Sequence, residues 1–281
     1  MIAGPSGSLT PPVLRSELAA RVASGIVLIA LALLATFLGG WPFQLLWLLA
    51  GLAILVEWTG MIRVEPLRAE QLLGCLGLTA TSGLVFSGRP LAGALALGIA
   101  CIAVVVIGRH GRDRSWSVLG IGYAAVIVIV PPYVRDRPEL GIVGILWMFA
   151  VVWATDIAAY FTGRALGGPK LWPNVSPKKT WSGFIGGLAA AIAAGLAVAA
   201  AAMGLDGIPP VSLPLVGLLS ALASVLAQLG DLGESAMKRR FGVKDSGKLI
   251  PGHGGVMDRL DGFWAAAAMV GLILAGVDLW K

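Results

Sequence analysis

The segment 228–261 combines carboxylates, lysines, arginines, glycines and one histidine between two strongly apolar stretches. It reads QLGDLGESAMKRRFGVKDSGKLIPGHGGVMDRLD. Charged side chains are costly beside a bilayer, so a block this polar next to apolar helices predicts a charged ligand. Carboxylates, basic side chains and glycine-rich backbone together suit a complex of a metal ion with a polyphosphate.

The carboxylates of this region and its surroundings are candidate metal ligands. Asp156 lies inside an apolar stretch, about two helical turns from its end, and a carboxylate there normally faces a partner or a wet cavity. Asp231 ends the stretch before the polar block, whereas Asp258 and Asp261 begin the next one, on one helix face. Mg²⁺ typically takes one or two carboxylates together with substrate phosphates. We therefore predict that Asp231 and Asp258 bind a divalent cation, with Asp156 and Asp261 as further candidates.

Each carboxylate also has a plain structural interpretation. Asp156 could pair with Arg164 further along the same helix. Asp258 and Asp261 could cap the N-terminus of the last helix, a role that is compatible with metal binding. Glu234 lies four residues before Lys238, and an ion pair on the helix surface is the favoured interpretation for it.

Two adjacent lysines lie near the end of a second polar stretch, 164–180. Lys178 and Lys179 follow Ser176 and Pro177. They could contact a phosphate at the membrane surface, or they could form an ordinary juxtamembrane cluster attracted to anionic lipid. The residue types alone favour neither interpretation.

The glycines of the polar block could bring backbone N–H groups to a phosphate. Residues 242–248 read GVKDSGK, but we reject a P-loop, because Leu249 stands where Ser or Thr is required and a helix precedes the segment. The turn PGHGG at 251–255 precedes a predicted helix N-terminus, which favours an anion. His253 alone is weak evidence, since a single histidine in a turn is often only hydrogen-bonded.

The composition indicates a polytopic helical membrane protein. Of 281 residues, 57% are hydrophobic and 13% are charged, whereas a soluble domain has about 25% charged residues. Cys75 and Cys101 both lie in apolar runs, which argues against a disulfide framework or a zinc site. The basic residues are not interleaved with aromatic ones, so nucleic acid is not an expected partner.

Hydrophobic runs long enough to cross a bilayer recur along the chain. A spanning helix needs about 20 apolar residues. Within one of these runs, Gly183 and Gly187 form a small-xxx-small pattern that predicts a close helix contact. The length criterion predicts about nine spans, at residues 22–40, 41–62, 71–88, 90–107, 116–134, 141–163, 181–203, 211–230 and 262–280.

The distribution of charge predicts the orientation. Most of the 21 Lys and Arg residues fall on the side of the N-terminus, and that side also holds both polar stretches. The positive-inside rule then places the N-terminus in the cytoplasm. We divide the chain into a cytoplasmic segment, 1–20, N-terminal membrane helices, 21–140, and a C-terminal catalytic membrane domain, 141–281, with cytoplasmic loops 164–180 and 231–261.

The polar residues of 153–262 resemble the phosphatidate cytidylyltransferase (CDP-diacylglycerol synthase) family. One block of that family corresponds to residues 156–164 and a second to SPKKTW at 176–181, where Ser182 replaces the Glu or Gln that often follows. The remaining motif residues are Ser235, Lys238-Arg239, Lys244-Asp245, the turn 251–255, Asp258-Arg259 and Asp261. Residues before 153 resemble the family only in hydropathy.

The resemblance implies a Mg²⁺-dependent reaction of CTP with phosphatidate that yields CDP-diacylglycerol and pyrophosphate. It implies metal-binding carboxylates at Asp231 and Asp258, and in some members a homodimer with a second, monovalent cation such as K⁺. It also implies a multi-pass protein of a bacterial-type inner membrane, whose active site faces the cytoplasm.

We assign expected roles to the remaining motif residues on this basis. Lys244, Lys248, Arg259 and the Gly254-Gly255 turn would cradle the triphosphate, and Lys178 and Lys179 would hold the phosphatidate headgroup. Asp156 would hold a second cation or position the other groups. Further substrate-binding candidates are Ser176, Ser235, Lys238, Arg239 and His253.

Two other functions stay open at this point. A CTP-dependent kinase of the polyprenol or dolichol type would also join CTP to a membrane lipid, but it would release CDP. A membrane transporter could use Asp156 as an ion site, although paired broken helices in two halves of the chain are not evident.

Overall fold

The structure is a computed structural model that describes residues 11–108, 111–139, 141–204, 211–250, 252 and 254–279. These residues form helices and one hairpin of two antiparallel strands. The elements in chain order are α1 (Pro11–Leu38), α2 (Gly40–Ile62), α3 (Leu67–Phe86), α4 (Pro90–Ile107), α5 (Gly111–Arg135), α6 (Gly141–Leu166), β1 (Lys170–Trp172), β2 (Ser176–Thr180), α7 (Trp181–Ala202), α8 (Leu213–Arg240) and α9 (Met257–Leu279).

The prediction of an all-α polytopic membrane protein is confirmed. Within the described residues, the eight helices from α2 to α9 are long and apolar enough to cross a bilayer. The apolar part of α1, Val22–Leu38, has 17 residues, or about 25 Å against a hydrocarbon core of about 30 Å. The predicted spans follow the helices, but α3, α5 and α9 begin four or five residues earlier than predicted. Helix α1 begins 11 residues earlier, and α8 ends ten residues later.

The polar block predicted as a loop over 231–261 is helical at both ends. Helix α8 continues to Arg240 and α9 begins at Met257, so the connection is only 241–256 and Asp231 lies within α8. That prediction was wrong, because charged residues do not by themselves end a helix. A Glu234–Lys238 ion pair at i,i+4 and basic residues in the last turn instead stabilise the helix to its end.

The predicted loop 164–180 is mostly structured. Helix α6 extends to Leu166, and β1 pairs with β2 so that Lys170 lies opposite Thr180. The Thr180 hydroxyl then caps α7 by accepting the N–H of Gly183 at 3.1 Å. The hairpin thereby places Lys179 two residues before the start of a membrane helix.

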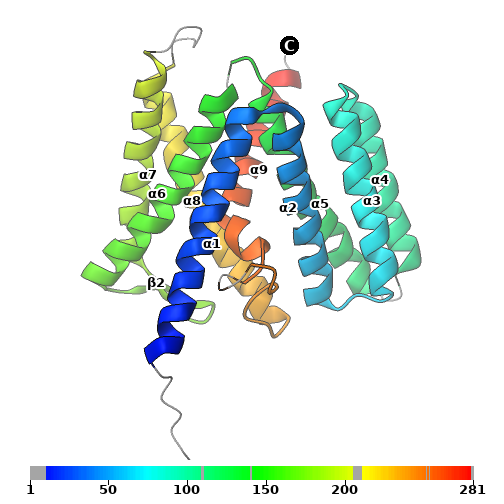
Figure 1. Ribbon diagram of the computed structural model, residues 1–281, viewed down its shortest axis with the longest axis horizontal. Coiled ribbons are helices and arrows are strands. Elements are labelled where there is room, and N and C mark those ends of the chain that lie inside the picture. The colour runs from blue at the N-terminus through cyan, green and yellow to red at the C-terminus, as the bar shows by residue number, and fades with distance from the viewer. Residues whose placement is uncertain are drawn as a thin grey trace, which may run out of the picture.

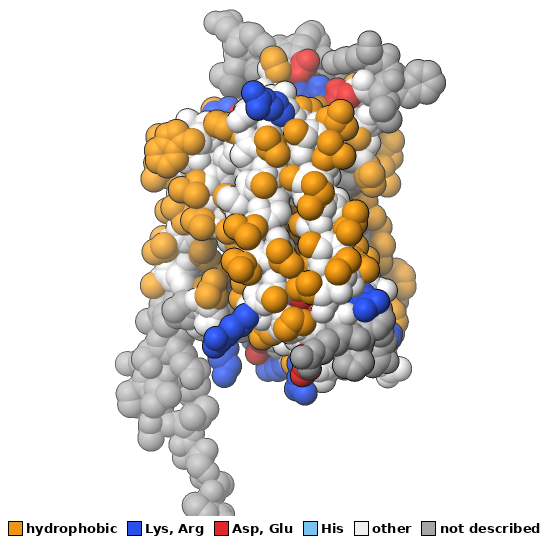
Figure 2. Space-filling view, turned by 90° about the vertical axis from the view of Figure 1, so that its right-hand side faces the viewer, with side chains coloured by type: hydrophobic (Ala, Val, Ile, Leu, Met, Phe, Trp, Pro, Cys, Tyr) orange, Lys and Arg blue, Asp and Glu red, His pale blue; other side chains and the backbone are white. Residues whose placement is uncertain are grey.

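Successive helices run in alternating directions, which gathers the polar connections at one end of the bundle (Figure 1). We call this end, with residues 63–66, 167–180 and 241–256, the polar end; it lies at the bottom of Figure 1. On the face shown in Figure 2, apolar side chains cover the middle of the bundle, and Lys and Arg lie toward its two ends. This pattern is that of a bundle surrounded by lipid.

Two kinds of contact bring the helices together. Aromatic rings stack between α2, α5 and α9, with centroids 4.9 Å apart for Trp47 and Phe263 and 4.4 Å apart for Tyr123 and Trp264. The contact of α6 with α7 uses glycine, because a Cβ on Gly183 would lie 2.7 Å from the Ala159 carbonyl oxygen. The predicted close contact at Gly183 and Gly187 is therefore confirmed.

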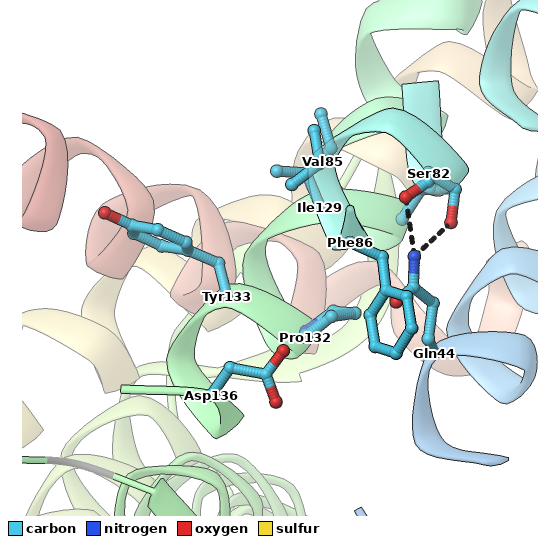
Figure 3. A pocket seen from close by; sticks show the side chains of 9 residues that line it. Gln44, Ser82, Val85, Phe86, Ile129, Pro132, Tyr133 and Asp136 are labelled. Atoms are coloured by element: carbon cyan, nitrogen blue, oxygen red, sulfur yellow. Dashed lines mark hydrogen bonds between the residues drawn. The ribbon is translucent and has the colours of Figure 1, made fainter. Parts of the chain in front are cut away.

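Two cavities lie toward the end opposite the polar end. The first, of about 140 Å³, is shown in Figure 3, where Gln44 donates to the backbone and hydroxyl oxygens of Ser82 at 2.6 and 2.9 Å. Burial raises the pKa of Asp136, another lining residue. The second is apolar, measures about 410 Å³ and lies between α6, α7, α8 and α9. Neither cavity contains a predicted site residue.

Candidate active site

An ion pair joins the strand hairpin to α8 at the polar end. The ammonium of Lys179 lies 2.5 Å from a carboxylate oxygen of Asp231, and the two side chains are 26% and 35% exposed. The Ser235 hydroxyl lies one turn further along α8, 3.5 Å from the other Asp231 oxygen. Three of the predicted site residues, from two distant sequence blocks, are therefore in one place.

Asp156 and Asp261 approach the same place from α6 and α9. Asp261 interacts electrostatically with Asp231 and Asp156, and Asp156 in turn interacts with Lys179 and Arg259. We call Asp156, Asp231 and Asp261 the carboxylate triad. Helices α6, α8 and α9 thus each contribute one acid to this group.

Gly230 explains how two of these acids can come together. A Cβ at this position would lie 2.9 Å from the backbone oxygen of Asp261 and 2.8 Å from the Ala265 side chain. Glycine therefore allows α8 to approach α9 closely just before Asp231. As a result, Asp231 and Asp261 both lie where α8 packs against α9.

The proposed pairing of Asp156 with Arg164 is not seen among the described residues. The Arg164 guanidinium donates instead to the Tyr160 hydroxyl at 3.1 Å. Asp156 is exposed on the protein surface, although it belongs to a candidate membrane span. An acid in that position needs a polar neighbourhood, which Lys179 and Arg259 supply.

Asp258 lies in a different set of contacts. Its carboxylate accepts from Lys238 at 2.6 Å, from the Ser246 N–H at 3.0 Å and from the Gly255 N–H at 2.9 Å. The bond to Gly255 reaches back across the start of α9. The prediction that Asp258 and Asp261 cap α9 is wrong, because Glu57 accepts the N–H groups of Val256 and Met257 at the helix start. Among the described residues, Asp261 accepts the adjacent N–H of Gly262, at 2.8 Å.

Lys238 bridges two carboxylates. It contacts Glu234 at 2.9 Å in addition to Asp258, and its side chain is 13% exposed, against 2% for Glu234. The predicted Glu234–Lys238 pair is confirmed, but its placement on the helix surface was wrong. Tertiary packing buries the pair, because α9 covers this face of α8.

The backbone donors predicted as an anion seat are bonded to carboxylates of the protein. Asp258 accepts from Gly255, and Glu57 of α2 accepts from Val256 and Met257, both at 2.9 Å. Gly254 has a φ of +84° and a Cβ there would lie 2.8 Å from Asp258, so only glycine fits this turn. His253 lies outside the described residues.

The remaining predicted residues line the outer surface of the polar end. Ser176 is partly buried in β2, opposite Trp172. Four basic residues among the predicted site residues are exposed in addition to Arg259: Lys178, Arg239, Lys244 and Lys248. Because these long side chains are exposed, they are available to a bound polyanion.

Sequence analysis missed Glu57, which touches the polar block at three points. It lies in α2, outside the residues that carry the family motifs. The rule that singled out Asp156, that an ionisable residue inside an apolar span has a role, applies to Glu57 equally and would have found it.

The arrangement fits a divalent cation that shares its ligands with a substrate. Among the described residues, no three Asp, Glu, His or Cys side chains form a metal-binding group. A cation here would therefore use one or two carboxylates and complete its shell with water and phosphate oxygens, as Mg²⁺ commonly does.

Comparison with known proteins identifies the family of this chain. A model of the cytidylyltransferase family matches residues 19–276. The chain belongs to the cytidylyltransferase family. It is 43% identical over 269 residues to a phosphatidate cytidylyltransferase of Brucella suis, with 94% of this chain and 97% of the relative covered. It is 32% identical over 268 residues to a phosphatidate cytidylyltransferase of Bacillus subtilis, with 91% and 97% covered.

These matches confirm the predicted resemblance and extend it. The motifs supported the resemblance only over 153–262, whereas the family match also includes most of α1 and all of α2 to α5. The names of the relatives agree with the predicted nucleotidyltransferase function. They favour neither the lipid kinase nor the transporter.

Proposed function

We propose that this protein joins CTP to phosphatidate, with Mg²⁺, to give CDP-diacylglycerol and pyrophosphate. Membership of the cytidylyltransferase family supports the nucleotidyl transfer, and the names of the relatives suggest phosphatidate as the acceptor. The observation that carries the assignment of the site is the meeting of acids from α6, α8 and α9 with Lys179 at the polar end.

The reaction needs positioning and charge compensation more than a strong base. The second pKa of a phosphate monoester is about 6, so the lipid phosphate is largely dianionic near neutral pH. One of its oxygens forms a bond to the α-phosphorus of CTP, and the bond from that phosphorus to the bridging oxygen breaks. Pyrophosphate leaves with the electron pair, so the site must hold two polyanions together and stabilise the charge that develops.

The basic residues divide naturally between the two substrates. Lys178 and Lys179 precede the membrane-embedded start of α7, at the level where a lipid phosphate lies, so we assign them to phosphatidate. Lys244, Lys248 and Arg259 are exposed at or beside the 241–256 connection and suit the triphosphate. Lys179 must exchange Asp231 for phosphate when the lipid binds, a change that frees carboxylate oxygens.

Mg²⁺ would be held by Asp231 together with Asp258 or Asp261, and it would neutralise charge on the triphosphate. Asp261 has fewer competing contacts, whereas Asp258 already accepts from Lys238 and two backbone amides. Asp156 is the candidate for a second, monovalent cation such as K⁺.

The test is the product formed by the purified protein in detergent or liposomes. Radiolabelled CTP and phosphatidate should give labelled CDP-diacylglycerol and one pyrophosphate per turnover, and EDTA should stop the reaction. Release of CDP with a polyprenol acceptor would instead identify a lipid kinase. Ion flux in liposomes that does not respond to CTP would identify a transporter.

Three further expectations accompany this proposal. The excess of basic residues at the polar end supports a cytoplasmic site in a bacterial-type inner membrane, which cysteine labelling at Lys244→Cys from either side would test. Activity measured in K⁺ against a large organic cation tests the monovalent site. Light scattering of the detergent complex tests a homodimer.

A further inference from the structure

Glu57 is a buried acid that reaches the polar block from the other half of the chain. It lies near the polar end of α2 and is 8% exposed. One carboxylate oxygen accepts the Val256 N–H at 2.9 Å, and the other accepts the Met257 N–H at 2.9 Å and the Ser246 hydroxyl at 3.1 Å. Three donors from the polar block therefore converge on one side chain of α2.

The backbone of the polar block is shaped around this carboxylate. A Cβ at Gly247 would lie 2.7 Å from one Glu57 oxygen, and a Cβ at Gly255 would lie 2.5 Å from the other. Two glycines therefore let the chain close around the Glu57 side chain from both sides. A surface ion pair would not require such a fit.

The segments that Glu57 holds are the ones that hold Asp258. Ser246 donates its hydroxyl to Glu57 and its backbone N–H to Asp258, while Gly255, which donates to Asp258, directly precedes the two residues bonded to Glu57. The same backbone segments therefore hydrogen-bond to both carboxylates, Glu57 and Asp258.

We propose that Glu57 is a positioning residue of the active site, which fixes the backbone around Ser246 and at residues 255–257 and thereby holds Asp258 in place on the nucleotide side of the site. This inference rests on the proposed function. It gives the N-terminal helices a role in the chemistry, since α2 supplies the acceptor that organises the nucleotide side of the site.

The chemistry of the three contacts requires a carboxylate. Two backbone N–H groups and a hydroxyl all donate to Glu57, so the side chain must be able to accept at both of its terminal atoms. In Glu57→Gln the amide NH₂ would face either the Val256 or the Met257 N–H, and donor would meet donor. Glu57→Asp keeps both acceptors but shortens the reach.

The first experiment measures kcat and KM for both substrates in Glu57→Gln, with Glu65→Gln as the matched control. Glu65 is an exposed acid of the same half, in the connection after α2. Loss of partners that orient ligands typically lowers activity roughly 10–100-fold, and we expect that loss in kcat/KM for CTP. The KM for phosphatidate should change less than about threefold, and Glu65→Gln should match the wild type.

A second readout does not depend on catalysis. Hydrogen exchange should show slow exchange at Val256 and Met257 in the wild type and in Glu65→Gln, and clearly faster exchange there in Glu57→Gln. If Glu57→Gln does not fold, Ser246→Ala removes one contact from the other side and should lower kcat/KM for CTP by a smaller factor. Glu57→Asp should recover part of the activity.

The outcomes separate this inference from the proposed function. Wild-type protein that does not convert CTP and phosphatidate refutes the proposed function, whatever the exchange data show. Faster exchange at 256–257 with unchanged kinetics refutes the positioning role of Glu57. So does an equal loss for both substrates accompanied by a lower melting temperature in Ser246→Ala, because that pattern indicates a merely structural contact.

Discussion

Replacement of Lys238 by methionine tests whether this lysine is a structural bridge or a ligand for substrate. Methionine keeps most of the apolar length of the side chain and removes the ammonium. In the structure that ammonium lies 2.9 Å from Glu234 and 2.6 Å from Asp258, and the Glu234 side chain is only 2% exposed. The substitution therefore leaves a buried carboxylate without its partner.

The expected magnitude follows from these two contacts. Each hydrogen bond to a charged group contributes about 1.5–3 kcal/mol, and removal of one partner from a buried ion pair costs about 3–5 kcal/mol. The second acceptor, Asp258, keeps its two backbone donors, so its lost contact with Lys238 adds little to the destabilisation. We expect a loss of about 3–5 kcal/mol, or a fall in Tm of roughly 6–20 °C at 2–4 °C per kcal/mol.

Thermal unfolding in detergent measures this loss, with Arg239→Met as the control. Arg239 is exposed in the same turn of α8, and a surface substitution there should stay within about 0.5 kcal/mol. The double substitution Glu234→Leu with Lys238→Met should recover part of the stability, since it removes both buried charges. A wild-type Tm in Lys238→Met together with a raised KM for CTP would refute the reasoning and make Lys238 a nucleotide ligand.

Three further predictions concern the carboxylate triad and its surroundings. Asp231→Asn should lower kcat at least about 100-fold at saturating Mg²⁺, with a Tm near that of the wild type because its ion pair is partly exposed; near-normal turnover would remove the metal role. Lys179→Ala should raise the KM for phosphatidate more than that for CTP in steady-state assays, and the opposite pattern would reverse the assignment of the lysines. Gly183→Ala should destabilise the α6–α7 contact by about 1–3 kcal/mol in thermal unfolding, whereas Gly122→Ala, which has open space around it, should not.

The membrane helices could be predicted closely because hydropathy is a local property. Each span needs only a run of apolar residues, so the spans predicted at 41–62 and 181–203 agree with α2 and α7 to within one residue. The end of α8 could not be found in this way. Its last turns are charged, and they stay helical because Lys238 pairs with acids on both its own helix and α9.

The partners of the acids could be predicted only in part. Asp156, Asp231, Asp258 and Asp261 were identified by residue type, position and motif. A shared ion between Asp231 and Asp258 stays a prediction, since their observed contacts differ. Asp231 interacts with Lys179 and with Asp261, whereas Asp258 is bonded to Lys238 and the 246–255 backbone.

By itself, the sequence determined that this is a helical membrane protein, with the motifs of a cytidylyltransferase gathered on one side of the bilayer. Only the tertiary structure decided which charges meet. Gly230 allows α8 to touch α9, and the packing of α2 brings Glu57 to the start of α9. The physical reason is that hydropathy and i,i+4 side-chain pairs depend on residues close together in the sequence. The partner of a charge, in contrast, depends on how closely helices distant in the sequence approach each other.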